Sequence, residues 1–165
     1  MNRSADNKPT LAIKRVSSQA DLVQVFSIRI RVFVREQRVP AEIELDQDDQ
    51  QAIHFLAIKA GKAVGTARVV MSRDGAKIGR MAVLKSYRRR GIGAALLKRA
   101  ILVSKRSRVR RIYLHAQVAV IGFYRRMGFR AVGGVFDEAG IAHQKMLFES
   151  KCFAQRHKGR EGPKK

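Results

Sequence analysis

The chain has one cysteine, few acidic residues and no long apolar segment, and each shortage excludes a class of protein. Cys152 has no partner for an internal disulfide, and no group of Cys and His residues has metal-ligand spacing. We therefore expect a reducing compartment and a metal-free site. No uninterrupted apolar run approaches the ~20 residues that a membrane-spanning helix needs, and the polar N-terminus lacks a signal peptide's apolar region. These features predict a cytoplasmic protein.

The shortage of acidic residues leaves a large positive charge. The chain has 35 Lys and Arg but only 13 Asp and Glu, which gives a formal net charge of +22. Such a charge attracts nucleic acid, anionic lipid or any other polyanion without sequence preference, so it names no partner. Residues 151–165 are polar and basic and are interrupted by glycine and proline, which favours a mobile, solubilising tail over a dedicated RNA-binding arm.

Length and composition predict a single folded domain. The 165 residues, 45% of them hydrophobic, suffice for one sizeable core but are short for two. We assign residues 1–10 to a flexible N-terminus, residues 11–150 to the domain and residues 151–165 to the basic tail.

Hydrophobic periodicity predicts strands that alternate with helices, and therefore an α/β fold with a mixed sheet flanked by helices. The first helix is expected to follow a cap at Ser17 or Ser18, to end before Pro40, and to bury Leu22, Val25 or Phe26, Ile30 and Phe33. The other expected helices span residues 90–105 and 118–127, and the expected strands span residues 11–16, 53–60, 64–71, 77–84, 111–115, 129–132 and 142–148.

The segment from residue 78 to residue 97 carries the strongest functional signal. An apolar strand runs into a turn of three arginines, residues 88–90, followed by Gly91 and by a helix that contains Gly93. Free backbone N–H groups and the positive end of the helix dipole would point at one spot there. Arginine adds forked donors suited to phosphate oxygens, and the glycines leave room for a bulky anion. The segment therefore predicts a phosphate-binding turn.

Two common phosphate motifs do not fit this turn. A Walker-type loop needs Lys and then Ser or Thr after its second glycine, whereas Gly93 is followed by Ala94. A dinucleotide fingerprint needs a third glycine at the position of Leu96 and an acidic residue about twenty positions further on, where this chain has Arg110 and Arg111. The remaining pattern is Arg-x-x-Gly-x-Gly, formed by residues 88–93.

This pattern resembles the pyrophosphate-binding motif of the GNAT superfamily of N-acetyltransferases. Residues 122–129, Gly-Phe-Tyr-Arg-Arg-Met-Gly-Phe, resemble the family's Phe-Tyr-x-x-x-Gly-Phe signature, in the same order and at the same distance along the chain. Further segments resemble one branch of this superfamily, the ElaA/YjcF-like acetyltransferases. They are residues 32–37, Glu44-x-Asp46-x-x-Asp49, His54, residues 114–117 and residues 136–143. The resemblance extends over roughly residues 11–148.

The resemblance implies a mostly antiparallel central sheet of about six to seven strands and direct transfer of an acetyl group from acetyl-CoA to a primary amine, in a ternary complex and without a metal. The strand at residues 79–83 would run beside the pantetheine arm, with N–H groups near Met81 or Val83 acting as an oxyanion hole. The cofactor-binding residues so implied are Met81, Ala82, Val83, Arg88, Arg89, Arg90, Gly91, Ile92, Gly93, Ala94, Gln117 and Tyr124. Gln117 stands where many relatives have Asn.

Tyr124 is the side chain to which the resemblance gives a chemical role. A phenol, with a reference pKa near ~10, can hydrogen-bond the departing thiolate and return a proton to it. The matched position of Tyr124 makes it the expected general acid. The alternative is an aromatic ring packed between helix and sheet, which is what we expect of Phe123 and Phe129.

The base and the acceptor site are open at this point. Five of the thirteen acids fall within eight residues: Glu42, Glu44, Asp46, Asp48 and Asp49. Such an island could hold a cationic amine, with Glu44 and Asp46 binding the substrate and Glu44 acting as base, or it could be a solvated loop that neutralises nearby arginines.

Three further residues are candidates for the acceptor side. His54 and His115 could each act as base or relay, although a strand histidine is more often structural. Glu36, on the first helix, is a candidate substrate-binding residue.

Other functions are compatible with the same sequence. A non-catalytic RNA- or ribosome-associated module on an acetyltransferase-like fold would explain the charge, although no aromatic-rich RNA platform is visible. An acyl-CoA sensor without catalysis is a further alternative, as is an acetyltransferase whose protein acceptor belongs to a polyanionic assembly. A homodimer paired through the late strands would agree with many relatives.

Overall fold

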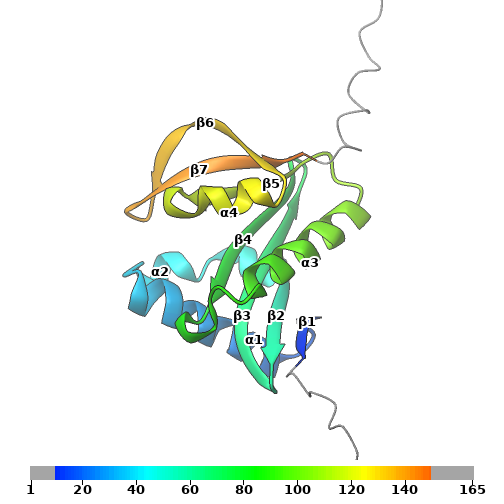
Figure 1. The fold of residues 1–165 in the computed structure, drawn as a ribbon, viewed down its shortest axis with the longest axis vertical. Coiled ribbons are helices and arrows are strands. Elements are labelled where there is room, and N and C mark those ends of the chain that lie inside the picture. Colours follow the sequence, from blue (N-terminus) through cyan, green and yellow to red (C-terminus); the bar gives the residue numbers. More distant parts are fainter. Residues whose placement is uncertain (1–9, 150–165) are drawn as a thin grey trace, which may run out of the picture.

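The computed structural model describes residues 10–149 and contains one seven-stranded sheet, in the order β1-β2-β3-β4-β5-β7-β6 (Figure 1). The first half of the chain comprises β1 (Leu11–Arg15), α1 (Gln19–Arg29), the π-helix η1 (Ile30–Glu36), α2 (Ala41–Glu44), the 3-10 turn η2 (Gln47–Gln50), β2 (Ile53–Lys59), β3 (Lys62–Ser72) and β4 (Gly75–Val83). The second half comprises the 3-10 turn η3 (Lys85–Tyr87), α3 (Ile92–Arg106), β5 (Ile112–Gln117), the 3-10 turn η4 (Val118–Val120), α4 (Ile121–Arg126), β6 (Phe129–Glu138) and β7 (Ile141–Phe148).

All neighbouring strands are antiparallel except β4 and β5. This topology confirms the expected mixed, mostly antiparallel sheet. The parallel pairing of β4 with β5 is short, extending only from Ala76 to Ile78 on β4. Beyond Ile78 the two strands have no ladder in common, so the edge of β4 that faces β5 is left without a strand partner.

A β-bulge lies on β4 where this separation begins. Arg68 of β3 pairs with Gly79, and Thr66 pairs with Ala82, so two residues of β4 oppose one residue of β3. The bulge places Arg80 in the left-handed region with φ 49°. A bulge bends its strand and redirects side chains, which turns this part of β4 away from the regular ladder.

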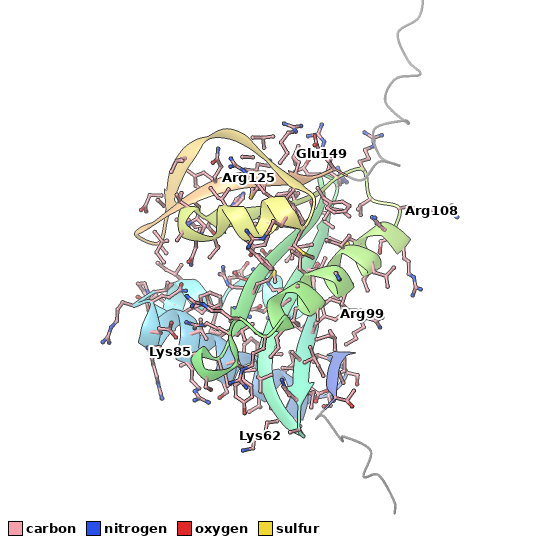
Figure 2. All side chains as sticks on the ribbon, viewed as in Figure 1. Lys62, Lys85, Arg99, Arg108, Arg125 and Glu149 are labelled. Carbon is pink, nitrogen blue, oxygen red and sulfur yellow. The ribbon has the colours of Figure 1, made fainter. Side chains whose placement is uncertain are left out.

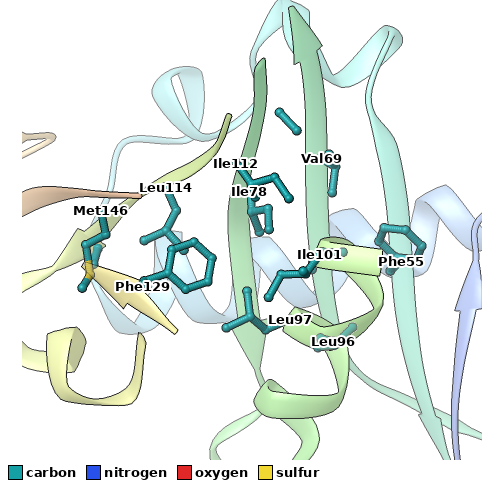
Figure 3. Packing of buried hydrophobic residues seen from close by; sticks show 14 of the residues in the cluster. Phe55, Val69, Ile78, Leu96, Leu97, Ile101, Ile112, Leu114, Phe129 and Met146 are labelled. Carbon is teal, nitrogen blue, oxygen red and sulfur yellow. The ribbon is translucent and has the colours of Figure 1, made fainter. Parts of the chain in front are cut away.

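Helices cover both faces of the sheet. Adjacent residues of one strand point to opposite faces, so they pack against different helices. Phe55 belongs to the large core cluster, which includes Leu96 and Leu97 of α3 (Figure 3). The next residue, Leu56, belongs to the second cluster, with Val25, Ile28 and Val32 of α1. Helix α3 therefore packs on one face and α1 on the other.

The first helix differs from its prediction in its buried face. Ser18 caps it as expected, accepting a hydrogen bond from the Asp21 N–H at 3.2 Å. Its buried residues include Arg29, whereas Leu22, Ile30 and Phe33 are only half-buried. An amphipathic pattern could not have placed an arginine there, because burial of that charge depends on acidic partners from another segment.

The late strands and the last helix also differ in extent from their predictions. β6 reaches Glu138 rather than residue 132, and the predicted helix at residues 118–127 divides into a 3-10 turn and the short helix α4. The predicted flexible terminus and basic tail lie outside the described residues, except for residue 10. No helix within residues 10–149 is long and apolar enough to cross a membrane.

Candidate functional site

A cleft of about 990 Å³ opens where β4 and β5 separate. It is lined by sequence-predicted residues from α2, the β4 bulge, the turn before α3, β5 and α4: Glu44, Met81, Ala82, Val83, Arg88, Arg89, Gly91, Ile92, Gly93, Ala94, His115, Gln117 and Tyr124. Glu36, Asp46, His54 and Arg90 do not line it. The strand separation thus brings most of the predicted residues to one place.

The turn before α3 has the geometry of an anion site. Gly91 is the N-cap of α3 with φ 77°, it makes no side-chain capping bond, and Arg89 is also left-handed with φ 60°. The first N–H groups of α3 are consequently not satisfied by a side chain and point out of the helix end. A Cβ added at Gly93 would meet only Phe123 Cζ, at 3.7 Å. These residues fit a pyrophosphate group.

Arg88 is fixed by contacts on two sides. Its Nε donates to the carbonyl oxygen of Val83 at 2.9 Å, and its two Nη atoms donate to the two carboxylate oxygens of Glu36 at 2.6 and 2.8 Å. These bonds lower the pKa of Glu36 and raise that of Arg88. Glu36 therefore lies beside the phosphate turn, apart from the acidic island with which it was grouped as an acceptor residue.

Tyr124 enters the cleft from the face of the sheet that α3 covers. Its ring packs edge-on against Phe123 and Phe129, with centroids 5.0 and 6.0 Å away. Its hydroxyl donates to the sulfur of Met81 at 3.7 Å. Burial raises the pKa of Tyr124 to about 12, so the phenol keeps its proton at neutral pH and can donate it.

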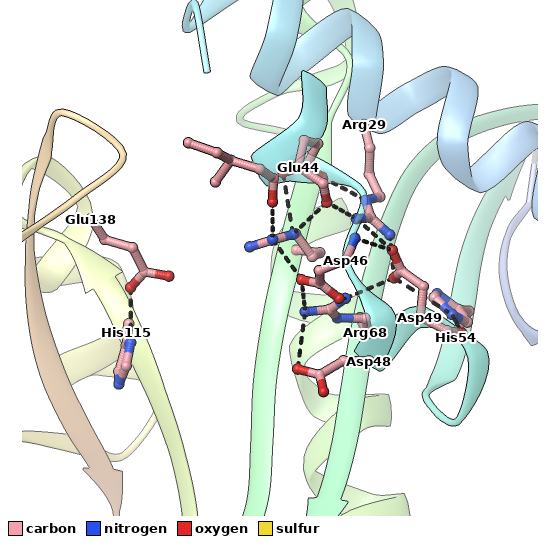
Figure 4. Close-up of polar contacts among 11 residues, drawn as sticks. Arg29, Glu44, Asp46, Asp48, Asp49, His54, Arg68, His115 and Glu138 are labelled. Atoms are coloured by element: carbon pink, nitrogen blue, oxygen red, sulfur yellow. Dashed lines mark hydrogen bonds and ion pairs between the residues drawn. The ribbon is translucent and has the colours of Figure 1, made fainter. Parts of the chain in front are cut away.

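The acidic island is bound to three arginines that come from α1, β3 and β4 (Figure 4). Arg29 is completely buried, and it donates to Glu44 at 2.6 Å and to Asp49 at 2.6 Å. We call this set the arginine–carboxylate network; it consists of Arg29, Glu44, Asp46, Asp49, Arg68 and Arg80. Its acids neutralise arginines, as the second alternative expected, but they do so within a largely buried network rather than in a solvated loop.

Burial and ion pairing compete within this network. Burial raises the pKa of Glu44, and the nearby arginines only partly offset it. Burial would also raise the pKa of Asp49, but hydrogen bonds from Arg29 and Arg68 outweigh it and lower that pKa. Glu44 lines the cleft, yet Arg29 Nε occupies one of its carboxylate oxygens at 2.6 Å and Arg80 Nε approaches the other at 3.2 Å. To act as a base, Glu44 would have to take up a proton beside two guanidinium groups that stabilise its ionised form.

His54 lies behind the network and outside the cleft. It is 4% exposed, and its Nε2 lies 2.9 Å from the carbonyl oxygen of Asp49. Burial lowers its pKa. Within the described part of the chain its Nδ1 has no hydrogen-bond partner. This placement corresponds to the structural alternative for His54, and we do not include it among the proposed catalytic residues.

His115 and Gln117 project from β5 into the cleft. His115 Nδ1 lies 2.9 Å from Glu138 Oε2, and the Gln117 amide donates to Gln37 Oε1 at 2.8 Å, which connects the end of β5 to the residue after η1. Sequence reasoning did not single out Glu138. It lies in the branch-like segment 136–143, but only the side-chain contact in the folded structure shows that its carboxylate meets His115.

The chain is similar in sequence and in structure to proteins of the GNAT acetyltransferase family. A family model described as Acetyltransferase (GNAT) domain matches residues 14–150. The uncharacterized N-acetyltransferase YjcF of Bacillus subtilis is 33% identical over 131 residues, which cover 79% of this chain and 94% of YjcF. The crystal structure of Escherichia coli ElaA covers 85% of this chain and 100% of its own, with a TM-score of 0.77 and 27% identity. A GNAT family acetyltransferase from Elizabethkingia anophelis with acetyl-CoA bound has the same fold, with a TM-score of 0.62 at 18% identity over 87% of this chain and 96% of its own.

Proposed function

The chain belongs to the GNAT acetyltransferase family, and on that premise we propose that it transfers an acetyl group from acetyl-CoA directly to a primary amine, with both substrates bound together. The observation that carries the proposal is the N-terminus of α3, where Gly91 has a left-handed backbone and no side chain caps the helix. This helix end lies on the same cleft as Tyr124. The helix N-terminus would supply an anion site, and Tyr124 would supply a proton donor. Because acetyl-CoA is an intracellular metabolite, we place the reaction in the cytoplasm.

The residues around the turn would hold the phosphates of the cosubstrate. The N–H groups of residues 91–94 and the guanidinium of Arg88 are the donors for the pyrophosphate. The unpaired edge of β4, residues 79–83, offers backbone groups to the extended pantetheine arm in the manner of an added strand. When bound, acetyl-CoA would supply the acetyl group as a thioester.

Backbone and side-chain donors near the bulge would then serve the transfer. Met81 and Val83 line the cleft, and an N–H group of one of them would polarise the carbonyl oxygen of the thioester. The hydroxyl of Tyr124 already donates to a sulfur atom, that of Met81, and would give its proton to the departing sulfur. Its raised pKa keeps the proton on the phenol until that moment.

The positions of the labelled cations give no specific support to the rival function of a nucleic-acid module. Of the cations labelled in Figure 2, Lys62, Lys85 and Arg108 lie at different edges of the molecule, whereas Arg125 lies on α4. A surface that tracks a nucleic-acid backbone gathers its cations on one face or groove.

Calorimetric titration of acetyl-CoA into the purified protein, stripped of nucleic acid, tests the proposal. We expect binding that Arg88→Ala and Gly91→Glu each weaken, because one removes a phosphate donor and the other adds a side chain and a negative charge at the turn. Tyr124→Phe keeps the aromatic ring, so it should bind acetyl-CoA only slightly more weakly than the wild type and lose turnover in a screen of primary amines. A folded wild-type protein that binds no acetyl-CoA would overturn the proposal and favour the basic binding module.

A further inference from the structure

His115 and Glu138 form a polar pair on the cleft, separate from the arginine–carboxylate network (Figure 4). His115 Nδ1 and Glu138 Oε2 are 2.9 Å apart, and the side chains are 25% and 38% exposed. The hydrogen bond from His115 lowers the pKa of Glu138 to about 2. An ionised carboxylate can only accept a hydrogen bond, so His115 Nδ1 must be the donor. A neutral His115 therefore keeps its lone pair on Nε2.

The pair lies on the face of the sheet opposite to Tyr124. Leu114 and Ala116 of β5 point into the core that α3 covers, so His115 between them points the other way. Phe136 of β6 lies on the same face as His115, because its ring meets the imidazole edge-on at 4.9 Å, and Glu138 two residues later follows it. Tyr124 packs against the α3-side core. The two groups thus approach the cleft from opposite sides.

This arrangement matches what acetyl transfer to an amine requires. The amine and the departing sulfur are different substituents on the acetyl carbon. A base that serves the amine and an acid that serves the sulfur therefore belong on different sides of that carbon. Resting on the function proposed above, we propose that His115 is the general base for the acceptor amine, and that Glu138 is the positioning residue that orients it.

The proton balance is complete without another reactant. Nε2 of His115 takes one proton from the ammonium R–NH₃⁺, which leaves R–NH₂ and an imidazolium beside the Glu138 carboxylate. The amine nitrogen bonds to the acetyl carbon, the carbon–sulfur bond breaks, and the sulfur receives a proton from Tyr124, which recovers one from the nitrogen. The imidazolium returns its proton to water, so ammonium and thioester become amide, thiol and one released proton.

The other titratable groups near His115 are two lysines and a second histidine, and none of them supplies a carboxylate that could orient the imidazole as Glu138 does. Lys145 of β7 lies opposite His115 but places its Nζ over the Tyr113 ring at 4.8 Å, and Lys77 of β4 also lines the cleft. The other cleft histidine, His143, has its Nδ1 2.7 Å from the carbonyl oxygen of Ile141, a neutral group that stabilises an imidazolium less than a carboxylate does.

The first test reads the tautomer and needs no acceptor. Long-range ¹H–¹⁵N NMR, recorded at a pH high enough for the imidazole to be uncharged and with the His115 signals assigned by their loss in His115→Gln, should show the neutral ring protonated on Nδ1. Glu138→Gln should mix the two tautomers. Asp137→Asn, a matched loss of one charge at the neighbouring residue that accepts the Gly140 N–H at 3.0 Å, should change nothing. A proton on Nε2 in the wild type, or no change in Glu138→Gln, overturns the proposal whether or not an amine is acetylated.

The second test compares two acceptors of different basicity. Benzylamine is an ammonium ion at neutral pH and needs a base, whereas hydroxylamine is already largely uncharged. His115→Gln should lower kcat/KM for benzylamine by ~100-fold, a typical contribution of general-base catalysis, and should affect hydroxylamine far less. Equal losses for both amines, or a loss in His143→Gln but not in His115→Gln, would refute the assignment.

Cosubstrate binding separates this proposal from the proposed function. Wild-type protein and His115→Gln should bind acetyl-CoA equally in calorimetry. Failure of the wild type to bind would refute the function itself, whereas normal binding with undiminished turnover in His115→Gln would refute only the base. If neither amine is acetylated, the tautomer measurement decides.

Discussion

The carboxylate of Glu36 engages both Nη atoms of Arg88, at 2.6 and 2.8 Å, across 52 positions of sequence. The pair connects η1 to the turn that precedes α3. A phosphate at that turn would compete with Glu36 for the same forked donor, and the carboxylate would repel it. The sequence suggested Glu36 for the acceptor, but in the structure its carboxylate binds Arg88, beside the turn for which we propose phosphate binding.

Glu36→Gln should tighten acetyl-CoA binding. The change frees Arg88 and removes a negative charge from the phosphate turn, and because both side chains are over a third exposed the gain is modest, a roughly two- to fivefold lower Kd. Calorimetry at low and high salt measures it, with Glu42→Gln as the control, since Glu42 is exposed and carries the same charge. Weaker binding in Glu36→Gln would mean that Glu36 instead holds Arg88 in its binding position.

Asp49→Asn should destabilise the fold strongly. Asp49 contacts both Arg29 and Arg68, and Arg29 is completely buried, so the variant leaves a buried cation short of its counter-charge. Breaking a buried pair in this way costs about 3–5 kcal/mol. Urea unfolding measures the loss. Asp48→Asn is the matched control, because Asp48 is 60% exposed and only 4.0 Å from Arg68, and it should change stability by less than ~1 kcal/mol.

His54 should make the fold less stable below pH ~6.5. Burial lowers its pKa from the ordinary value of 6.5, so as the pH falls below that value the unfolded chain binds a proton that the folded chain does not. Stability then falls by up to about 1.4 kcal/mol per pH unit until the folded pKa is reached. The contribution of Glu44 to the pH dependence of stability has the opposite sign. Its raised pKa lets the folded state take up a proton before the unfolded state does as the pH falls.

Thermal unfolding between pH 7.5 and pH 5 isolates the His54 contribution when wild type is compared with His54→Gln. The pKa values of Asp46 and Asp49 are lowered from 3.8, so their contributions are lost only at more acidic pH. A glutamine can still donate toward the Asp49 carbonyl but does not titrate. Parallel pH profiles for the two proteins would contradict the prediction.

Gly75→Ala should disrupt the start of β4. Gly75 has φ 133°, and a Cβ there would overlap the backbone carbonyl oxygen of Arg111, which accepts the Ala76 N–H where β4 meets β5. We expect a loss of about 3 kcal/mol or more in urea unfolding. Gly61→Ala is the control: its φ is 73° but nothing lies within 4 Å of the added carbon, so only ~1 kcal/mol of backbone strain should appear. Equal losses would show that backbone conformation alone matters.

The fold and the local geometry of the turn before α3 could be predicted from sequence because both depend on short segments. The turn around Gly91 takes its geometry from a few consecutive residues and from the end of the helix that follows. Strand positions follow hydrophobic alternation, so six of the seven expected strands deviate from the observed bounds by no more than two residues at either end, and the order of elements was right. The exception, β6, is longer because its second half pairs with β7 without entering the core.

The sequence by itself therefore determined the family, and its local motifs predicted the phosphate turn and the role of Tyr124. Only the tertiary structure decided the partners of the charged residues: Glu44 and Asp49 bind Arg29, Glu36 binds Arg88, and Glu138 binds His115. These partners lie 15 to 52 positions apart. Periodicity reports which side of an element is buried, but the state of a carboxylate or an imidazole depends on the desolvation and the charges that distant segments bring to it.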